Sequence, residues 1–435
     1  MSKIAIVSLG YLWFPCETGT SRFFHIAMMA AGAGQDVEVI TTDFQHFEKR
    51  PRNKELIRQQ HYPFKITFIH APAYRRNIGI GRILSNRQAV RNIRHYLENR
   101  IRSYDAVYIS IPANDIGAEV CELCRENHVP CIVDVEDLWP EAMSMVLPQE
   151  KLRNFLLRRF YTDAERVYKS CSGVVGTSED YTARAFKHQK RDIPSATVYV
   201  GCDLADFDAG VREFCTGGAA EGGVGRGTGA GVACAPLPVR KPEGEFWVTY
   251  AGSISTSYDI RTLVMAGKEL MEQGHRDIRI LILGTGSNKE QLEKLASREN
   301  ISNVEFLGFQ PYHRMAAILN ESDVVVNSFI RNAPQSMVNK IGDYLASGTP
   351  MINTLQNPYF CEFVKRNRCG VNVRPEDPAS LTRAILYLKE NPQIRIRMGK
   401  NARKCAEAEF DRAVSYKKIL EIIGACISRG GGNAS

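Results

Sequence analysis

Short apolar runs alternate with longer amphipathic stretches along most of the chain, and this alternation limits the possible folds more than any other feature. Each run suits one buried strand and the stretches between have helical spacing, so the pattern predicts parallel strands joined by helices. In the first half the expected strands are Lys3 to Leu9, Val37 to Thr41, Ile66 to His70, Ala106 to Ile109, Cys131 to Val135, Gly173 to Gly176 and Thr197 to Val200. From Phe246 the pattern restarts, with Trp247 to Ala251, Ile278 to Leu283, Val304 to Phe306, Val324 to Asn327, Met351 to Asn353 and Gly370 to Val373. Two doubly wound, Rossmann-like α/β domains follow from it.

The two series are separated by a segment of different composition. Eight of the fifteen residues from Gly217 to Gly231 are glycine, and such a segment buries too little apolar area to offset its ordering entropy. We expect a first domain over residues 1–207, a linker or surface insertion over 208–244 and a second domain over 245–400. In residues 401–435 an amphipathic helix is expected to pack back towards the first domain, followed by a disordered tail.

Composition and charge exclude several classes of protein. The 435 residues are 44% hydrophobic and 24% charged, as in globular proteins with room for two cores. The net charge of +8 is moderate, and no block of like charges marks a nucleic-acid tail. No apolar run approaches the roughly 18 residues that span a bilayer, and the chain enters a strand pattern at once. We therefore expect a cytoplasmic protein that binds no nucleic acid, with the inner face of the membrane as an alternative location.

One cysteine cluster has a superficial likeness to a metal site. Cys121, Cys124, His128 and Cys131 lie within eleven residues, a shorter span than the usual zinc-ligand spacings. We interpret them as small buried thiols and a loop histidine.

The segment from Ser336 to Pro350 has the features of an anion site. It lies between two strand-like runs, and its helix is expected to begin with Asn339 and Lys340. Free backbone N–H groups and a cation converge at such a place, which favours a diphosphate. Lys340 and Asp343 share a helix face, where a cation and a carboxylate suit a phosphate and the hydroxyls of a ribose. The alternative is a surface Lys–Asp pair at helical spacing.

Two glycine-containing loops are expected at the same edge of the second sheet. They are Gly252-Ser253-Ile254 after the first strand and Gly284-Thr285-Gly286 after the second. Glycine lets a backbone approach a ligand closely, and the carboxyl ends of parallel strands meet at one edge. Each loop alone is an ordinary turn. Together with Asn339, Lys340 and Asp343 they form a candidate nucleotide pocket.

Seven segments, in order along the chain, carry a resemblance to a known family. They are Pro15 to Phe23, Asp134 to Glu141, Val200 to Asp203, Tyr250 to Ser253 with Tyr258-Asp259, Leu283 to Gly286, Phe306 to Gln310, and Asn339 to Leu345. In this order they resemble glycosyltransferase family 4, the retaining enzymes of the GT-B fold, in the branch that builds capsular and other surface polysaccharides.

The resemblance implies an enzyme that transfers a sugar from a nucleoside-diphosphate donor, with retention, to a glycan or polyprenyl-linked acceptor. It implies no metal and no other cofactor, with Lys340 stabilising the leaving diphosphate and Asp343 receiving the ribose hydroxyls. The donor site that it implies comprises Gly252, Ser253, Gly284, Gly286, Phe309, Gln310, Gln335, Asn339, Lys340 and Asp343. A fixed cation and helix N-terminal donors can stabilise a departing diphosphate in place of a metal.

On the acceptor or phosphate side, the same resemblance implies Gly19, Thr20, Arg22, Glu136 and Asp137. Asp137 is also suited to cap a helix that begins at Pro140.

The sequence departs from the family pattern at several positions. The paired glutamates of the family become Gln335 and Asp343, so one carboxylate that would contact the donor sugar is missing. The loop after the first strand of the second domain lacks the family's cations, so charge compensation falls on Lys340, with Arg331 or Arg22 as further candidates. Relatives often carry a histidine after the fourth strand of the first domain, and the matching position in this chain is near Ser110. No general base is assigned.

Two further groups of residues have competing interpretations. His25 and His46 are interpreted as satisfied polar residues. The stretch from Lys151 to Tyr161 mixes basic and apolar residues at helical spacing. We interpret it as a helix that packs its apolar face on the sheet, with peripheral membrane contact as the alternative.

Two other functions suit the same architecture. A sugar-nucleotide epimerase would need an acid–base set that the sequence does not reveal. A non-catalytic nucleotide-sugar-binding subunit of a polysaccharide assembly complex would be consistent with Gln335 and the missing loop cations.

Overall fold

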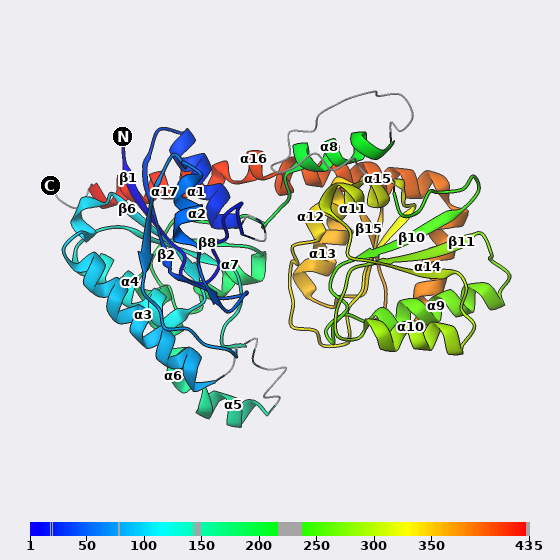
Figure 1. Cartoon of the computed structure of the whole chain (residues 1–435), viewed down its shortest axis with the longest axis horizontal. Coiled ribbons are helices and arrows are strands. Elements are labelled where there is room, and N and C mark those ends of the chain that lie inside the picture. The colour runs from blue at the N-terminus through cyan, green and yellow to red at the C-terminus, as the bar shows by residue number, and fades with distance from the viewer. Residues whose placement is uncertain are drawn as a thin grey trace. The chain divides into compact units, whose positions relative to one another are not determined.

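The computed structural model describes residues 1–17, 19, 21–76, 79–141, 143, 149–215 and 237–431 (Figure 1). It divides into two compact units, Met1–Val200 with Ser415–Ser435, and Gly201–Val414. Each unit is built on one parallel sheet with helices packed on it, so the two expected doubly wound domains are present. The division falls at residue 200 rather than 207, and residues 201–214 and 401–414 lie in the second unit. The glycine-rich stretch from 217 to 231 lies outside the described residues.

The sheet of the first unit has seven parallel strands in the order β5-β2-β1-β6-β7-β8-β9. Their bounds are β1 Lys3–Val7, β2 Asp36–Thr42, β5 Lys65–Ile69, β6 Ala106–Ile111, β7 Cys131–Val135, β8 Gly173–Gly176 and β9 Ser195–Thr197. The last strand begins two residues earlier than expected, because Ser195 pairs with Val174 of β8 and the pairing ends at Thr197. A small antiparallel hairpin, β3 Phe44–Gln45 with β4 Arg50–Pro51, was not predicted.

Helices cover both faces of this sheet. The helices of the first unit are α1 Arg22–Gly32, α2 Lys54–Gln59, α3 Ile80–Glu98, α4 Asn114–Glu126, α5 Glu150–Leu156, α6 Arg158–Ser170, α7 Glu179–Ala185 and α17 Lys417–Gly431. The helices α3, α4, α6 and α7 share one core with alternate strand residues such as Val133. The helices α1 and α17 share the other core, with the intervening residues such as Ile132. The period of two in the strands therefore separates two apolar layers.

The sheet of the second unit has six parallel strands in the order β12-β11-β10-β13-β14-β15. Their bounds are β10 Phe246–Ala251, β11 Ile278–Leu283, β12 Val304–Gly308, β13 Val324–Asn327, β14 Met351–Asn353 and β15 Gly370–Asn372. Each overlaps its predicted strand, because continuous runs of Val, Ile and Leu suit a parallel sheet that is covered on both faces. Most side chains of β10, β11 and β13 are buried.

The helices of the second unit begin where the sequence supplies caps. Asn357-Pro358 and Asp377-Pro378 start two of them, with the Asn or Asp side chain accepting backbone N–H groups and proline in the first turn. The helices are α8 Leu204–Cys215, α9 Ile260–Glu272, α10 Lys289–Arg298, α11 Tyr312–Glu321, α12 Ile341–Ala346, α13 Pro358–Asn367, α14 Pro378–Glu390, α15 Pro392–Cys405 and α16 Arg412–Ser415. None of the helices in the described part of the chain combines the length and the apolar character that crossing a bilayer requires.

The amphipathic helix expected in residues 401–435 is interrupted. A π-helical turn at Ala406–Phe410 follows α15, and the chain then pairs with residue 202. The N–H of Cys202 donates to the carbonyl of Phe410 over 2.9 Å, and the N–H of Arg412 donates to the carbonyl of Cys202 over 3.1 Å. Gly201 permits this approach, because its φ is +66° and a Cβ there would lie 2.2 Å from the Phe410 oxygen.

The cysteine cluster is structural, as the sequence indicated. Cys121, Cys124 and Cys131 are free and buried in the core of the first unit, with the Cys121 and Cys131 sulfurs 3.5 Å apart. Among the described residues, no group of three or more histidine, cysteine or acidic side chains has a geometry that could hold a metal ion.

Candidate functional site

The second sheet reverses its strand order beside β10, with β11 on one side and β13 on the other. In open parallel sheets a ligand crevice forms at the carboxyl ends of the strands where the order reverses. The loop after β10 carries Gly252 and Ser253, and the segment after β13 runs from residue 328 to 340. The switch point therefore joins the loops that the sequence singled out.

Close packing between two loops accounts for the glycines at this edge. The N–H of Gly252 donates to the carbonyl of Leu283, and the N–H of Ile254 to that of Thr285, each over 2.9 Å. A Cβ on Gly284 would lie 1.9 Å from the Gly252 oxygen, and one on Gly286 would lie 2.2 Å from the Ile254 oxygen. Gly284 also has a φ of +133°, a region that favours glycine. These residues hold the loops together, a role that needs no ligand.

Lys340 inserts its amine into a cluster of aromatic rings instead of pointing along the helix beside Asp343. Its Nζ lies 4.2 Å from the ring centre of Tyr250, 4.7 Å from Tyr258, 5.4 Å from Phe329 and 5.6 Å from Tyr344. We call these four rings the aromatic cage. The Nζ atom is buried and has no hydrogen-bond partner in the described part of the chain, and this burial holds the pKa of the lysine well below its usual range.

Asp343 lies in a separate environment on α12. Its Oδ1 accepts a hydrogen bond from the Tyr312 hydroxyl over 2.9 Å. Burial raises the pKa of Asp343 to about 6, although the Tyr312 hydrogen bond and the charge of Arg412 act in the opposite direction. The expected alignment of Lys340 and Asp343 on one helix face is wrong for the side-chain ends, because Lys340 is the capping residue before a helix of only six residues. The anion site expected at the start of that helix stays a prediction.

Other expected donor-site residues lie around the same edge. Phe309 follows β12 and is 75% exposed, while the side-chain amide of Gln310 donates to the Leu307 carbonyl over 2.6 Å. Asn339 is exposed. The Gln335 oxygen Oε1 is buried and has no hydrogen-bond partner among the described residues, so it is an acceptor open to a ligand.

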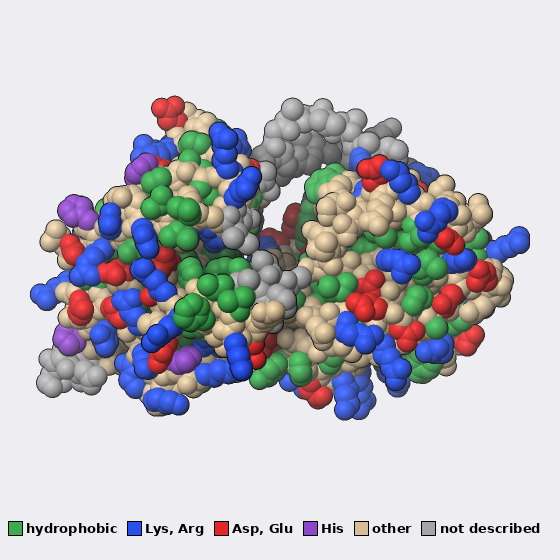
Figure 2. All heavy atoms as spheres, turned by 90° about the horizontal axis from the view of Figure 1, so that it is seen from below, with side chains coloured by type: hydrophobic (Ala, Val, Ile, Leu, Met, Phe, Trp, Pro, Cys, Tyr) green, Lys and Arg blue, Asp and Glu red, His purple; other side chains and the backbone are tan. Residues whose placement is uncertain are grey.

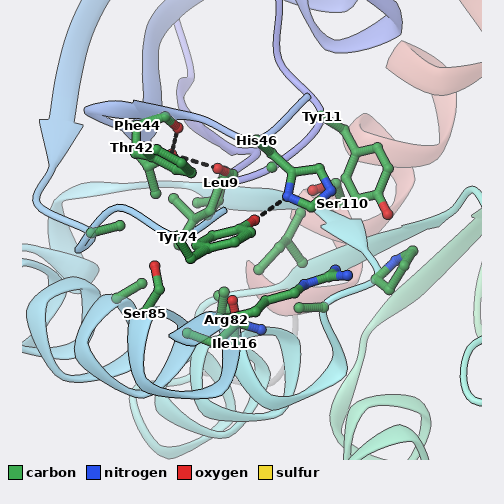
Figure 3. Close-up of a pocket in the computed structure, with 18 residues that line it drawn as sticks. Leu9, Tyr11, Thr42, Phe44, His46, Tyr74, Arg82, Ser85, Ser110 and Ile116 are labelled. Atoms are coloured by element: carbon green, nitrogen blue, oxygen red, sulfur yellow. Dashed lines mark hydrogen bonds between the residues drawn. The ribbon is translucent and has the colours of Figure 1, made fainter. Parts of the chain in front are cut away.

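The first sheet has an equivalent switch point between β1 and β6, and a pocket opens there (Figure 3). Its walls come from the loop after β1, the end of β2, the beginning of α3 and the end of β6. The residues labelled around it are Leu9, Tyr11, Thr42, Phe44, His46, Tyr74, Arg82, Ser85, Ser110 and Ile116. The empty space among its lining side chains is about 600 Å³, including the open mouth.

One wall of this pocket is polar and contains His46, whose pKa is shifted by its surroundings. The Nδ1 atom of His46 is hydrogen-bonded to the hydroxyl of Tyr74. Burial, together with the charges of Arg82 and Lys49, lowers the pKa of His46 to about 4. At neutral pH the imidazole is therefore uncharged, with one ring nitrogen as a donor and the other as an acceptor.

Two expected acceptor-side carboxyls, Glu136 and Asp137, follow β7 and influence Tyr11, which lines the same pocket. Burial and the nearby charge of Asp134 raise the pKa of Glu136 to about 8, and burial also raises the pKa of Asp137. Both carboxyls act with burial to raise the pKa of the Tyr11 hydroxyl. These effects favour the protonated form of Glu136, which can donate a hydrogen bond.

Arg22 has a structural partner. Its Nε atom donates to Asp134 over 2.7 Å and its Nη1 to the Tyr199 carbonyl over 3.0 Å, and both charged side chains are almost fully buried. The Tyr108 hydroxyl donates to the same carboxylate oxygen over 2.5 Å. Arg22 thus lies in a buried network of the first unit, and its expected place beside a phosphate or acceptor stays a prediction.

The remaining acceptor-side predictions lie in the loop after β1. Gly19 has a φ of +151°, and a Cβ there would meet no atom within 4 Å. Thr20 lies outside the described residues.

Sequence reasoning missed Tyr74 and Arg82 and interpreted His46 as a satisfied polar residue. The available signal was that the strands ending near residues 7 and 109 flank the switch point, so the loops that follow them converge. Ser110 was recognised as the position of a family histidine, and it does line the pocket.

Comparison with known proteins gives a family match within the second unit. Residues 238–405 match the sequence model of the family described as Glycosyl transferases group 1. The chain is 24% identical over 195 residues to the putative colanic acid biosynthesis glycosyltransferase WcaL of Escherichia coli (strain K12), covering 44% of this chain and 48% of that protein. It is also 24% identical over 177 residues to an uncharacterised glycosyltransferase of Methanocaldococcus jannaschii, covering 40% and 44%. The chain thus spans about half the length of the curated relatives that it matches.

Solved structures resemble the chain over almost its whole length. Anabaena HepE in complex with UDP superposes with a TM-score of 0.66 at 15% identity, over 98% of this chain and 100% of that one. The sucrose-phosphate synthase of Thermosynechococcus elongatus gives a TM-score of 0.67 at 17% identity, over 100% of both chains. At these identities the likeness shows the fold, which is the GT-B fold.

Proposed function

We propose that the chain is a retaining glycosyltransferase, similar to family 4, that moves a sugar from a nucleoside-diphosphate donor to a glycan or lipid-linked acceptor in surface-polysaccharide biosynthesis. The observation that carries the proposal is the match of residues 238–405 to the group 1 glycosyltransferases. That segment contains every loop at the switch point of the second sheet. Structures of the same fold in complex with UDP and with UDP-glucose support a nucleotide-sugar donor.

The described residues supply groups suited to such a donor. Phe309 offers an exposed ring to a base, and the ionised Asp343 offers two oxygens to ribose hydroxyls. The unsatisfied Oε1 of Gln335 is an acceptor for a sugar hydroxyl. We place the diphosphate near Lys340, since a departing diphosphate develops negative charge that the protonated amine would stabilise.

In this proposal Lys340 has two positions. In the ligand-free protein the amine lies in the aromatic cage with its pKa held low. A diphosphate would favour the protonated amine and draw it out of the cage, because an opposite charge raises the pKa of a lysine. Donor binding and proton uptake by Lys340 are therefore linked.

The test is calorimetric titration of the full chain with UDP, GDP and their sugars, followed by assay of released nucleoside diphosphate with an acceptor panel. Lys340→Ala is expected to weaken binding of the diphosphate about tenfold or more and to lower turnover by about 100-fold. The matched control is Lys365→Ala, which removes an exposed lysine on α13 of the same unit.

Equal binding and turnover in wild type and Lys340→Ala would refute the role of this residue. Donor binding without transfer to any acceptor would favour the binding-subunit alternative. A change in the sugar of the donor without acceptor, followed by NMR, would favour the epimerase.

A further inference from the structure

One helix of the first unit buries none of its residues. In α5 (Glu150–Leu156) the apolar residues Leu152, Phe155 and Leu156 are all exposed, Phe155 to 78%. They are spaced i, i+3 and i+4, so they form one face of the helix. Of residues 151–161 only Leu157, between α5 and α6, is buried, and α6 buries later residues such as Ala164 and Val167. For α5 the packed interpretation is wrong.

A second exposed apolar group lies at the beginning of α3. Ile80 is 76% exposed, and Ile83 and Leu84 in the same turn are exposed as well. The buried side of this helix is formed by Ser85, Ala89, Ile93 and Leu97. The exposed group thus lies on the solvent side, which Arg87 and Arg91 continue at helical spacing.

Both groups lie at the same edge of the unit. Helices that alternate with parallel strands run opposite to them, so α3 and α6 both begin at the carboxyl edge of the sheet, and α5 ends directly before α6. Figure 1 shows α5 at the lower edge of this unit. Figure 2, which views the molecule from below, shows hydrophobic side chains gathered there among lysines and arginines. We call this region the α3–α5 surface and define it by Ile80, Ile83, Leu84, Leu152, Phe155 and Leu156.

Basic residues outnumber acidic ones in the flanking sequence. Residues 71–97 contain six arginines and no aspartate or glutamate, and residues 150–162 contain four basic residues and one acidic residue, Glu150. Arg75, Arg76, Arg87, Lys151 and Arg158 are among the exposed members. An apolar patch with a basic surround matches the two layers of an anionic membrane surface, the acyl chains and the phosphate headgroups.

We propose that the α3–α5 surface docks on a lipid bilayer that carries anionic headgroups. The face of α5 inserts Leu152, Phe155 and Leu156 below the headgroups, and Lys151 and Arg158 contact lipid phosphates. Arg82 belongs to the same turn of α3 but extends into the pocket of the first unit (Figure 3), so it is not part of this contact. The inference is independent of the proposed sugar transfer.

The test is sedimentation of the full chain with vesicles of phosphatidylcholine alone and of phosphatidylcholine with about one third phosphatidylglycerol. Wild type is expected to bind the anionic vesicles and to dissociate as salt is added. Leu152→Ser combined with Phe155→Ser is expected to lower the partition coefficient about tenfold or more. Lys151→Glu combined with Arg158→Glu is expected to abolish the preference for anionic lipid.

The matched control is Ile396→Ser, which removes an exposed aliphatic side chain from α15 in the second unit and is expected to bind like wild type. A variant that does not fold is replaced by Phe155→Trp, whose fluorescence brominated lipids should quench. The proposal is overturned if wild type ignores anionic vesicles or binds neutral ones equally, or if Ile396→Ser loses as much binding. It is also overturned if the α5 variants convert a dimer into a monomer, since the surface would then join two copies.

Binding of UDP in lipid-free solution is expected to be the same in wild type and in the α5 variants. Loss of membrane binding with unchanged nucleotide binding separates this inference from the proposed function.

Discussion

Lys340 is the residue at which stability and proposed function conflict. Its amine is buried among four rings without a hydrogen-bond partner, and an unsatisfied buried polar group costs about 1–3 kcal/mol. The low pKa means that, below the usual lysine pKa, the unfolded chain binds a proton more readily than the folded one. The contribution of Lys340 to stability therefore falls as the pH decreases from the alkaline range.

Replacing this amine tests that conflict. Lys340→Met is expected to raise the free energy of unfolding of the ligand-free protein by about 1 kcal/mol at neutral pH, because a thioether suits the aromatic cage better than an amine. Thermal unfolding followed by calorimetry at neutral and alkaline pH measures the change, which should shrink as the pH rises. A variant less stable than wild type at neutral pH would show that the cage favours the cation.

Asp343 predicts a pH dependence of donor binding. Its pKa of about 6 lies above that of an unfolded aspartate, so folding favours the protonated form and this stabilisation is lost as the pH rises through 6. Ribose hydroxyls need the ionised carboxylate, so UDP affinity should fall as the pH decreases below about 6, and Asp343→Asn should remove this step. Calorimetric titration across this range measures both. Glu290→Gln, on the surface of α10, is the matched control, and a step that persists in Asp343→Asn would assign it to another group.

At the scale of elements, the positions of the loops in the second unit were predictable from the sequence. The structural role of their glycines was not. The strands before Gly252 and Gly284 follow from their apolar runs, and parallel pairing brings the carboxyl ends together. The glycines were interpreted as space for a ligand, but a Cβ on Gly284 would meet the backbone of the loop after β10, and one on Gly252 would meet the side chains of Tyr250 and Lys340. The sequence names the loop residues, whereas only the contact between distant loops shows what each glycine avoids.

Replacing glycine by alanine at a packed and at an open position distinguishes two effects on stability, the steric clash of a new Cβ and the lower flexibility of the unfolded chain. Gly284→Ala is expected to destabilise the second unit by about 2–4 kcal/mol, because its Cβ would lie 1.9 Å from the Gly252 oxygen. Gly424→Ala in α17, where a Cβ meets no atom within 4 Å, should instead stabilise by about 0.5–1 kcal/mol. Chemical denaturation of both variants provides the comparison. Similar effects of the two substitutions would contradict the packing argument.

At the scale of the whole molecule, the end of the chain completes the core of the first unit. Tyr416, Ile419, Ile423 and Cys426 belong to the same apolar cluster as α1 and β1. The Tyr416 ring also lies 4.9 Å from the guanidinium carbon of Arg22, which is paired with Asp134. Residues more than two hundred positions apart thus share one buried network.

Removing residues 415–435 is therefore expected to destabilise the first unit and to leave the second intact. Each of Tyr416, Ile419 and Ile423 contributes about 1.5–3 kcal/mol by burial, and Arg22 loses one of its contacts. Hydrogen exchange followed by mass spectrometry should show lost protection in β1 and α1 but unchanged protection in β10 and β11. Equal loss in both units would show that they unfold as one.

The sequence alone determined the two parallel sheets, the order of most strands and helices, and the loops around the candidate site. Those features depend on hydrophobic period, caps and glycines, which act between near neighbours in the chain. Tertiary structure alone decided that Lys340 enters an aromatic cage, that Arg22 pairs with Asp134, that His46, Tyr74 and Arg82 line one pocket, and that α5 is left uncovered. The partner of a side chain depends on contacts between segments that are distant in sequence. A local sequence pattern does not show which distant segment packs against it.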